Sequence, residues 1–249
     1  MRTISAVSLQ VVMLACFALA QTSPTKQPAA AKPPSATVKP VPSGWGNPIA
    51  TINTTVGVMH CTLFPDKAPI GVANFIGLAN GTKDWKNPVS GATKHGVPLY
   101  DGTIFHRVIP GFMIQGGDPA GNGSGDPGYG FGVEASPDLL FDRPGRLAYA
   151  HSDRPKSNGS QFFITEDAAH SQHLSGLYTI FGQCDDATVA LVKQISQMAS
   201  DPSTNKPFRP VKINHISVQR AAVPAQPAGT AAKKPAGTTQ KTPANPVDK

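Results

Sequence analysis

The segment that decides the fold is FHRVIPGFMIQGGD, residues 105–118. Its Pro-Gly pair predicts a tight turn between two short strands. Because side chains alternate along a strand, Arg107 lies on one face of the first strand, and Met113 and Gln115 share one face of the second. Where these faces coincide, a guanidinium, a thioether and a carboxamide meet on an exposed sheet surface. The alternative is an isolated surface arginine in an ordinary ion pair.

A second segment, SNGSQFFIT (residues 157–165), has a similar pattern. Its Asn-Gly pair predicts a turn before a strand. On that strand Gln161 and Phe163 share one face, whereas Phe162 and Ile164 lie on the other. A phenylalanine on each face is expected for a strand between a core and an apolar pocket, and equally for a strand buried on both sides.

Composition narrows the fold class. Of 249 residues, 24 are Gly and 25 are Pro, and only 15% are charged. This excludes a coiled coil and disfavours a bundle of long helices, because both need helix-forming residues. Short runs bounded by turn residues are predicted as strands, namely residues 51–54, 58–64, 103–108, 112–115, 146–150, 161–165, 179–183 and 211–219.

Two amphipathic helices accompany these strands. The first begins at Pro69 and ends at Asn80-Gly81, because proline suits the first helical position and glycine commonly follows a helix end. The second begins near Asp185-Asp186, where acidic side chains stabilise a helix N-terminus. Many short strands with two helices predict a mainly β fold, a closed barrel with helical lids.

The distribution of charge excludes one class of partner. The net charge is +7, but residues 47–220 carry 14 basic and 14 acidic side chains, so the excess lies in the terminal segments. A folded nucleic-acid-binding domain carries its basic patch on the domain itself. We therefore expect no nucleic-acid partner.

Residues 1–20 are predicted to be a secretory signal peptide. Arg2 gives a short positive region, an apolar run follows, and Ala18-Leu19-Ala20 has the form of a cleavage site. The apolar run is shorter than a membrane span requires. The sequence therefore predicts a periplasmic or secreted protein cleaved after Ala20, with lipidation at Cys16 as the less favoured alternative.

Two segments rich in Pro, Ala and Lys flank the central region. Residues 21–46 and 221–249 lack the apolar side chains needed to offset the entropy of ordering. We expect them to be a disordered linker and a disordered basic tail around a folded domain at residues 47–220. Their lysines allow weak association with an anionic envelope surface, although a solvated spacer is the favoured role.

Two cysteines, Cys61 and Cys184, remain after cleavage in an oxidising compartment. A bond between them would close a long loop and stabilise the fold by about 4–5 kcal/mol. Since the sequence does not give their separation, we interpret them instead as separate small apolar residues on buried strands.

The two segments quoted above and YTIFG (residues 178–182), in this order and spacing, resemble the cyclophilin-type peptidyl-prolyl cis-trans isomerases. The resemblance extends from Ile49 to Gln219. It implies an eight-stranded antiparallel β-barrel capped by two α-helices, which agrees with the fold class predicted from the residues. Together with the signal peptide, it implies a monomeric, exported isomerase that acts on Pro-containing polypeptides during folding.

The resemblance also assigns residues to a site. The catalytic arginine of the family falls on Arg107, and the residues expected to bind substrate are Phe112, Met113, Gln115, Ala150, His151, Gln161, Phe163, His173, Leu174 and Tyr178. Three of these depart from well-known members of the family. His151 replaces the usual Asn, His173 replaces a common Trp, and Tyr178 stands where many members have His.

The chemistry needs no nucleophile, metal or cofactor. Rotation about an X-Pro bond must break amide resonance, with a barrier of about 20 kcal/mol. The twisted amide has a prolyl nitrogen that accepts a hydrogen bond, so a permanently charged donor such as Arg107 favours it over the planar amide. The alternative function is a catalytically idle module that holds Pro-containing segments in the same groove. A structural envelope protein held by its basic tails is a third interpretation.

Overall fold

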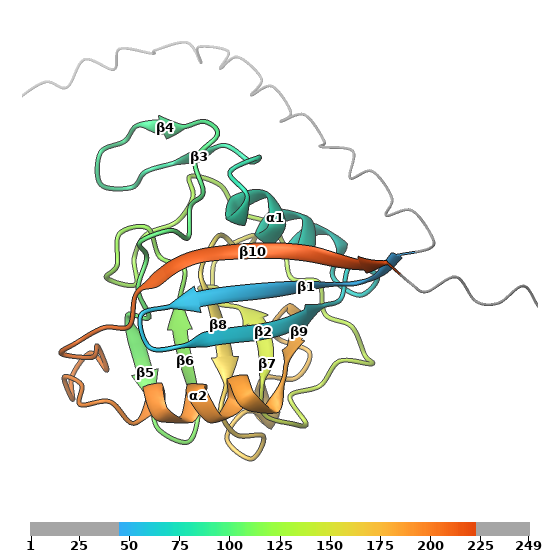
Figure 1. The fold of residues 1–249 in the computed structure, drawn as a ribbon, viewed down its shortest axis with the longest axis vertical. Helices are drawn as coiled ribbons and strands as arrows, with labels where there is room; N and C mark the ends of the chain where they lie inside the picture. Colours follow the sequence, from blue (N-terminus) through green and yellow to red (C-terminus); the bar gives the residue numbers. More distant parts are fainter. Residues whose placement is uncertain (1–44, 223–249) are drawn as a thin grey trace, which may run out of the picture. The chain divides into compact units, whose positions relative to one another are not determined.

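The computed structural model describes residues 45–222 (Figure 1). The described range begins and ends with two long strands, β1 (Trp45–Thr54) and β10 (Ile213–Ala222), which pair in antiparallel orientation. These strands extend two residues beyond the domain boundaries expected from the sequence. The expected signal peptide, the linker up to residue 44 and the tail from residue 223 lie outside the described residues.

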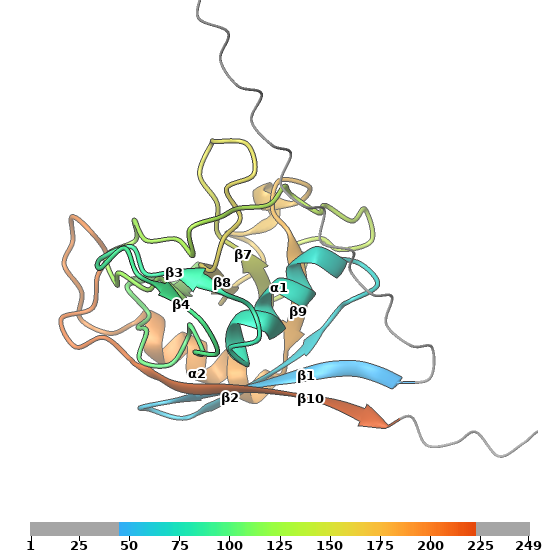
Figure 2. The ribbon, with the colours of Figure 1, turned by 90° about the horizontal axis from the view of Figure 1, so that it is seen from above.

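Eight strands form one antiparallel sheet in the order β10-β1-β2-β9-β7-β8-β6-β5. The remaining strands of the sheet are β2 (Val58–Leu63), β5 (Arg107–Ile109), β6 (Met113–Gly116), β7 (Arg146–Tyr149), β8 (Phe162–Thr165) and β9 (Ile180–Cys184). Figure 2 shows β1, β2 and β10 curving together along one side of the domain. The mainly β, eight-stranded antiparallel fold with two helices is confirmed.

The two edges of the curled sheet meet just before β5 and β10. Ile104 pairs with Lys212 in an isolated antiparallel bridge, and the backbone N–H of Ile213 donates to the carbonyl oxygen of Thr103 at 2.8 Å. The sequence predicted one strand over residues 103–108. The chain instead changes partner within this range, because its first half faces the segment before β10 and its second half pairs with β6.

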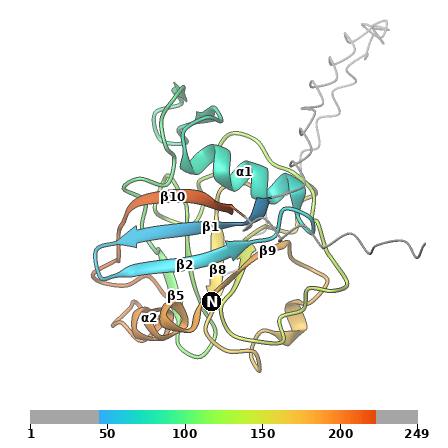
Figure 3. The ribbon, with the colours of Figure 1, turned by 45° about the vertical axis from the view of Figure 1, so that its right-hand side comes forward.

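Two helices lie at opposite ends of the curled sheet (Figures 1 and 3). The helix α1 (Pro69–Ala79) begins with a proline and ends at Asn80, as predicted, and lies beside β10. The helix α2 (Asp186–Ser196) begins after Asp185, whose side chain accepts a hydrogen bond from the backbone N–H of Thr188 at 2.8 Å. This cap satisfies one of the free donors at the helix start. Within the described residues, no helix reaches the length and hydropathy that a bilayer span requires.

A short hairpin of β3 (Trp85–Lys86) and β4 (Thr93–Lys94) lies outside the barrel, next to α1 in Figure 1. The indole Nε1 of Trp85 donates to the carbonyl oxygen of Val97 at 2.9 Å, and the ring is buried. This hairpin was not predicted from the sequence, because strands of two residues are too short to show alternation.

The core has two parts on the two faces of β8. Phe162 and Ile164 point into the barrel, where Phe162 packs edge-to-face against Phe75 and Tyr100 at centroid distances of 5.7 and 5.6 Å. Phe163 points the other way, into a smaller apolar cluster. The strand is therefore buried on both faces, by the core on one side and by this second cluster on the other.

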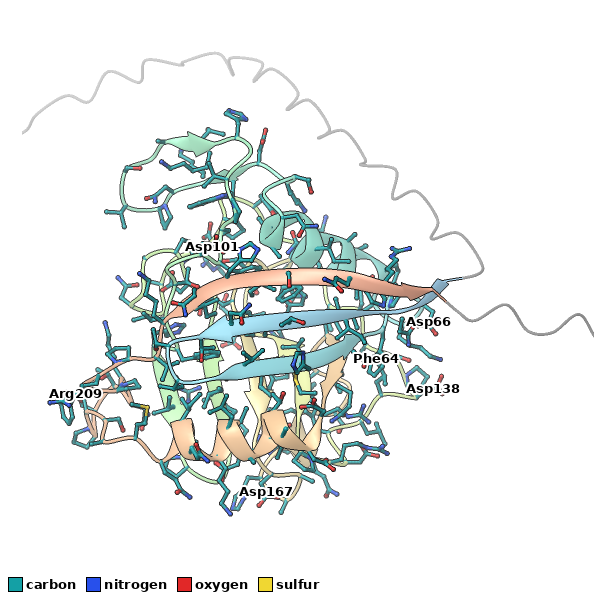
Figure 4. All side chains as sticks on the ribbon, in the orientation of Figure 1. Phe64, Asp66, Asp101, Asp138, Asp167 and Arg209 are labelled. Atoms are coloured by element: carbon teal, nitrogen blue, oxygen red, sulfur yellow. A yellow bond between two sulfur atoms is a disulfide. The ribbon has the colours of Figure 1, made fainter. Side chains whose placement is uncertain are left out.

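Charged side chains are distributed around the domain. Asp101, Asp138 and Arg209 are exposed at separate places on its surface (Figure 4). Two of them make exposed ion pairs, Asp138 with Lys67 and Asp101 with His215. Such pairs contribute little to stability, so the fold depends mainly on its apolar clusters and on its covalent cross-link.

The cross-link is a disulfide between Cys61 of β2 and Cys184 of β9, with an S–S distance of 2.04 Å. The prediction that these cysteines are separate apolar residues is wrong. They are directly opposite each other in adjacent antiparallel strands, and both are buried. The sequence could not show this, because 123 residues separate them along the chain and only the sheet order makes β2 and β9 neighbours.

We expect the free energy of unfolding of the double variant Cys61→Ala/Cys184→Ala to be about 2–5 kcal/mol lower than that of the wild type. Without the disulfide, the unfolded chain no longer contains a closed loop, so its conformational entropy is higher. Urea unfolding followed by tryptophan fluorescence measures this loss. The reduced wild type is the control, since it keeps both sulfur atoms and loses only the bond. A double variant as stable as the oxidised wild type would contradict the prediction.

Candidate functional site

A line of three polar side chains crosses the sheet at β5, β6 and the start of β8. Arg107 is paired with Gln115 in the sheet register, and its Nη1 donates to Gln115 Oε1 at 3.3 Å. The Nε2 of Gln115 donates to Gln161 Oε1 at 2.9 Å. The structure thus brings these three residues to one face, as the alternation of side chains predicts. Each is half-buried, so the guanidinium is oriented by the protein and still accessible to a ligand.

An apolar floor lies beside this polar line. Met113 and Phe163 come from the paired strands β6 and β8 and are 1% and 4% exposed. Leu174 adds to the floor from the short 3₁₀ helix η1 (Gln172–Leu174). Phe112 is half-buried at its edge. A guanidinium next to a dry apolar surface is suited to bind a small apolar ring with a hydrogen-bond acceptor at one corner.

The floor contains a residue that the sequence analysis missed. Phe141 is fully buried and stacks on Phe163, with a centroid distance of 5.8 Å and an angle of 12° between the rings. It lies in an irregular segment between β6 and β7, where no periodic pattern marks a buried side chain. A lone aromatic residue among turn residues was the only signal available.

The segment that carries Phe141 is held by an arginine of β7. Arg146 donates from Nε to the carbonyl oxygen of Leu140 at 2.8 Å and from Nη2 to Asp142 Oδ1 at 2.7 Å. Hydrogen bonds from Arg143 and from Arg146 hold the pKa of Asp142 well below its usual range. The carboxylate therefore stays charged, and the loop is fixed under the floor.

The rim of the groove is formed by two irregular segments. The backbone N–H of Ala150 donates to the carbonyl oxygen of Gln161 at 3.0 Å, which places the segment after β7 along the polar line. His151 stacks against Tyr178, with a centroid distance of 4.4 Å, and Tyr178 meets Phe163 edge-on at 5.6 Å. Two of the three departures from the family pattern therefore contact each other at this rim.

The third departure lies on η1. His173 is exposed and stacks on Phe112, with a centroid distance of 6.3 Å and an angle of 25°. The structure thus places all the expected substrate-binding side chains around one groove, on β6, β8, η1 and the two rim segments.

The turn between β5 and β6 is fastened to α2. Gly111, at the tip, has a φ of 75°, a value that glycine adopts without strain. Its backbone N–H donates to Glu166 Oε2 at 2.8 Å, and the same oxygen accepts a hydrogen bond from Ser196 Oγ at 2.5 Å. Glu166 was also missed by the sequence analysis, because its partners are distant along the chain. Glu166 thus holds the β5–β6 turn, which sets the position of Arg107 relative to the floor.

A cavity of about 570 Å³ adjoins the polar line on the side away from the floor. It is lined by Gln115, Gln161, the first rim segment and a glycine-rich loop at residues 123–130. Nε2 of Gln161 donates to the carbonyl oxygens of Gly123 and Gly125 at 3.0 and 2.8 Å. The glutamine therefore joins the groove and the cavity into one extended surface.

The neighbour of Arg107 does not take part in this site. His106 is buried on the opposite face, and neither ring nitrogen has a hydrogen-bond partner among residues 45–222. Burial lowers the pKa of its ring, so it is neutral and cannot reach a ligand in the groove. Within the same residues, no cluster of three His, Cys, Asp or Glu side chains could hold a metal ion. What the groove offers is one charged donor, amide groups and an apolar surface.

The comparisons with known proteins point to one family. Residues 49–218 match the family model described as cyclophilin type peptidyl-prolyl cis-trans isomerase/CLD. The peptidyl-prolyl cis-trans isomerase A of Mycobacterium tuberculosis (strain ATCC 25618 / H37Rv) is 48% identical over 170 residues, which cover 68% of this chain and 91% of that protein. The isomerase B of Streptomyces anulatus is 45% identical over 171 residues, covering 68% and 95% of the two chains.

A solved structure agrees with these sequences. The crystal structure of a cyclophilin type peptidyl-prolyl cis-trans isomerase of Cryptosporidium parvum, determined in the presence of the dipeptide Ala-Pro, has 35% sequence identity and a TM-score of 0.55. The match covers 69% of this chain and 98% of that chain.

The loop under the floor gives a pH-dependent prediction. We expect Asp142→Asn to lower the free energy of unfolding by about 1 kcal/mol at pH 7, since Asp142 is half-exposed and its ion pairs are partly screened. A carboxyl group whose pKa is lower in the folded state than in the unfolded state stabilises the fold at pH values above the unfolded-state pKa. This stabilisation is lost as the pH falls towards the folded-state pKa. The difference between variant and wild type should therefore shrink between pH 5 and pH 2.

Urea unfolding at several pH values measures this difference. Asp138→Asn is the matched control, because it removes an ion pair with Lys67 in which the Asp138 side chain is 68% exposed, compared with 40% for Asp142. A difference between wild type and Asp142→Asn that stays constant from pH 7 to pH 2 would refute the assigned role of Asp142.

Proposed function

Since this chain belongs to the cyclophilin-type peptidyl-prolyl cis-trans isomerases and has their activity, we propose that it acts on X-Pro bonds of exported proteins and that Arg107 is its catalytic donor. The observation that carries the assignment is the Arg107 guanidinium, held by Gln115 at 3.3 Å beside the floor of Met113 and Phe163.

The proposed mechanism follows from the amide. In the planar X-Pro bond the nitrogen lone pair is delocalised and accepts no hydrogen bond, whereas rotation localises it on nitrogen. A donor placed at that nitrogen stabilises the twisted amide more than the ground state, and only such differential stabilisation accelerates the reaction. Arg107 is suited to this role because a guanidinium keeps its charge at any pH of interest.

One hydrogen bond does not supply all of the catalysis. A hydrogen bond from a charged group contributes about 1.5–3 kcal/mol, which corresponds to roughly one to two decades of rate. The proline ring is proposed to rest on the floor of Met113, Phe163 and Leu174, so that only the residue before proline rotates. Gln161 and the backbone at Ala150 are proposed to hold the chain on either side of the bond.

An exported location is proposed on two grounds. The first 20 residues have the features of a signal peptide. The disulfide between Cys61 and Cys184 supports the same proposal, because structural disulfides form and persist in oxidising compartments. The substrates are then proteins that fold after they cross the membrane, where slow X-Pro rotation delays folding.

We expect Arg107→Ala to lower kcat/KM for a short X-Pro peptide by about 10–100-fold, because it removes the donor to the twisted nitrogen. The measurement is the rate of cis-to-trans relaxation with the full chain. Arg209→Ala is the matched control, since Arg209 is exposed on another part of the surface. Circular dichroism shows whether each variant is folded.

Two outcomes would redirect the proposal. A folded Arg107→Ala variant with full activity would remove Arg107 from catalysis. A folded wild type that binds X-Pro peptides without accelerating their rotation would favour the idle binding module.

The proposed export is tested by fractionation. We expect the full chain, expressed in a bacterial host, to appear outside the cytoplasm with Gln21 as its first residue, because processing is predicted after Ala20. Deletion of residues 2–20 should keep it in the cytoplasm. Cys16→Ser separates the two processing routes, because it blocks lipidation and leaves simple cleavage intact. Retention of the full chain in the cytoplasm would overturn the proposal.

A further inference from the structure

His151 joins the two segments of the rim. Its Nε2 lies 2.9 Å from the carbonyl oxygen of Leu177, in the segment before β9. Its Nδ1 lies 3.0 Å from the carbonyl oxygen of Ser152, in the segment after β7. Both distances are those of hydrogen bonds, so one imidazole ring contacts an acceptor on each side.

These two contacts place a requirement on the ring. A carbonyl oxygen only accepts hydrogen bonds, so both ring nitrogens must donate for both contacts to be favourable. A neutral imidazole has one N–H and one lone pair, and its lone pair would face a carbonyl oxygen with no proton between them. Only the imidazolium has two donors. With a proton on Nε2 alone, the ring keeps its hydrogen bond to Leu177 in the other segment, and protonation adds the donor at Nδ1 that the carbonyl oxygen of Ser152 can accept.

The bridged segments are parts of the proposed substrate groove. The segment of His151 is tied to the polar line by the hydrogen bond from the Ala150 N–H to the carbonyl oxygen of Gln161. The segment of Leu177 continues directly into Tyr178, which covers one edge of Phe163. A bond between His151 and Leu177 thus fixes how far apart the two rim segments lie.

We propose that His151 is a positioning residue whose protonation adds the second of these hydrogen bonds and so fixes the ring in its orientation between the two rim segments, so that the enzyme binds X-Pro segments more tightly at mildly acidic pH than at neutral pH. The proposal rests on the proposed function of the groove. Histidine side chains change charge between pH 5 and 8, so the change falls within the range in which the enzyme can be assayed.

Several other groups surround this ring. Tyr178 is stacked on it from the segment before β9, and Asp126, Arg154 and Lys156 line the adjoining cavity. A second histidine, His173, lies near the groove, but it stacks on Phe112 and belongs to η1 rather than to the bridged segments. A variant at His151 itself is therefore needed to assign a pH effect to this residue.

The first test is a pH profile of the Michaelis constants. For the wild type we expect KM for an X-Pro peptide to be about three- to tenfold lower at pH 5.5 than at pH 7.5. This is the change in binding that the gain of one hydrogen bond is expected to produce. His151→Asn keeps a donor for one carbonyl and does not titrate, so its KM should not change over this range. The control His95→Gln removes an exposed histidine of the β3–β4 hairpin segment, and its profile should follow that of the wild type.

The second test does not depend on activity. Hydrogen-exchange protection factors of the amides at residues 152–157 and 175–178 should rise on acidification in the wild type and stay constant in His151→Asn. Equal protection at both pH values in the wild type, or the same increase in both proteins, would overturn the bridge. Loss of isomerase activity at every pH with a normal protection change would instead count against the proposed function and leave the bridge standing.

Discussion

The antiparallel pairing of β6 with β8 determines where every part of the groove lies. In this register Gln115 is opposite Phe163, so a polar and an apolar residue of the groove share one face. Side chains alternate along a strand, and a slip of one residue would turn Phe163 into the barrel and Phe162 out of it. The edge-to-face contacts of Phe162 with Phe75 and Tyr100 oppose such a slip, because they fill the interior with rings of fitted shape. The packing of the core thus fixes the geometry of a site on the opposite face.

The groove combines parts of different rigidity. Its donor and two residues of its floor, Met113 and Phe163, come from the paired strands β5, β6 and β8, whose relative positions are fixed by the sheet hydrogen bonds. Its rim comes from irregular segments held by a few side-chain contacts, such as that of His151 with Leu177. This division suits a reaction in which one half of the substrate stays on the floor while the other half rotates past the rim. Catalysis of rotation requires a fixed donor at the nitrogen and room for the moving carbonyl.

The sequence was sufficient wherever a short-range rule determined the structure. Alternation placed Arg107 and Gln115 on one face, and capping rules gave the start and end of α1. The parts that the sequence did not show depend on contacts between distant segments. Phe141 is buried by a loop that is held by Arg146 and by a hydrogen bond from the Phe141 N–H to Ser175 Oγ, and Glu166 connects a turn to a helix.

The disulfide and the β3–β4 hairpin have the same explanation. Cys61 and Cys184 become neighbours through the sheet order. The hairpin is positioned by the buried indole of Trp85 and by a hydrogen bond from the Lys86 N–H to the carbonyl oxygen of Pro127. No local pattern encodes either feature, because each depends on which segments the completed barrel brings together.

The fold and the rim respond to different properties of the solvent. The disulfide links β2 to β9 inside the sheet, so the stability of the barrel depends on the redox state of its surroundings. The proposed bridge at His151 depends on proton concentration and links only surface segments. A barrel cross-linked by a covalent bond can keep its floor unchanged while the rim opens or closes, because Met113 and Phe163 are held by strands that the bridge does not touch. Such a separation allows acidity to adjust binding in the groove without a loss of the folded state.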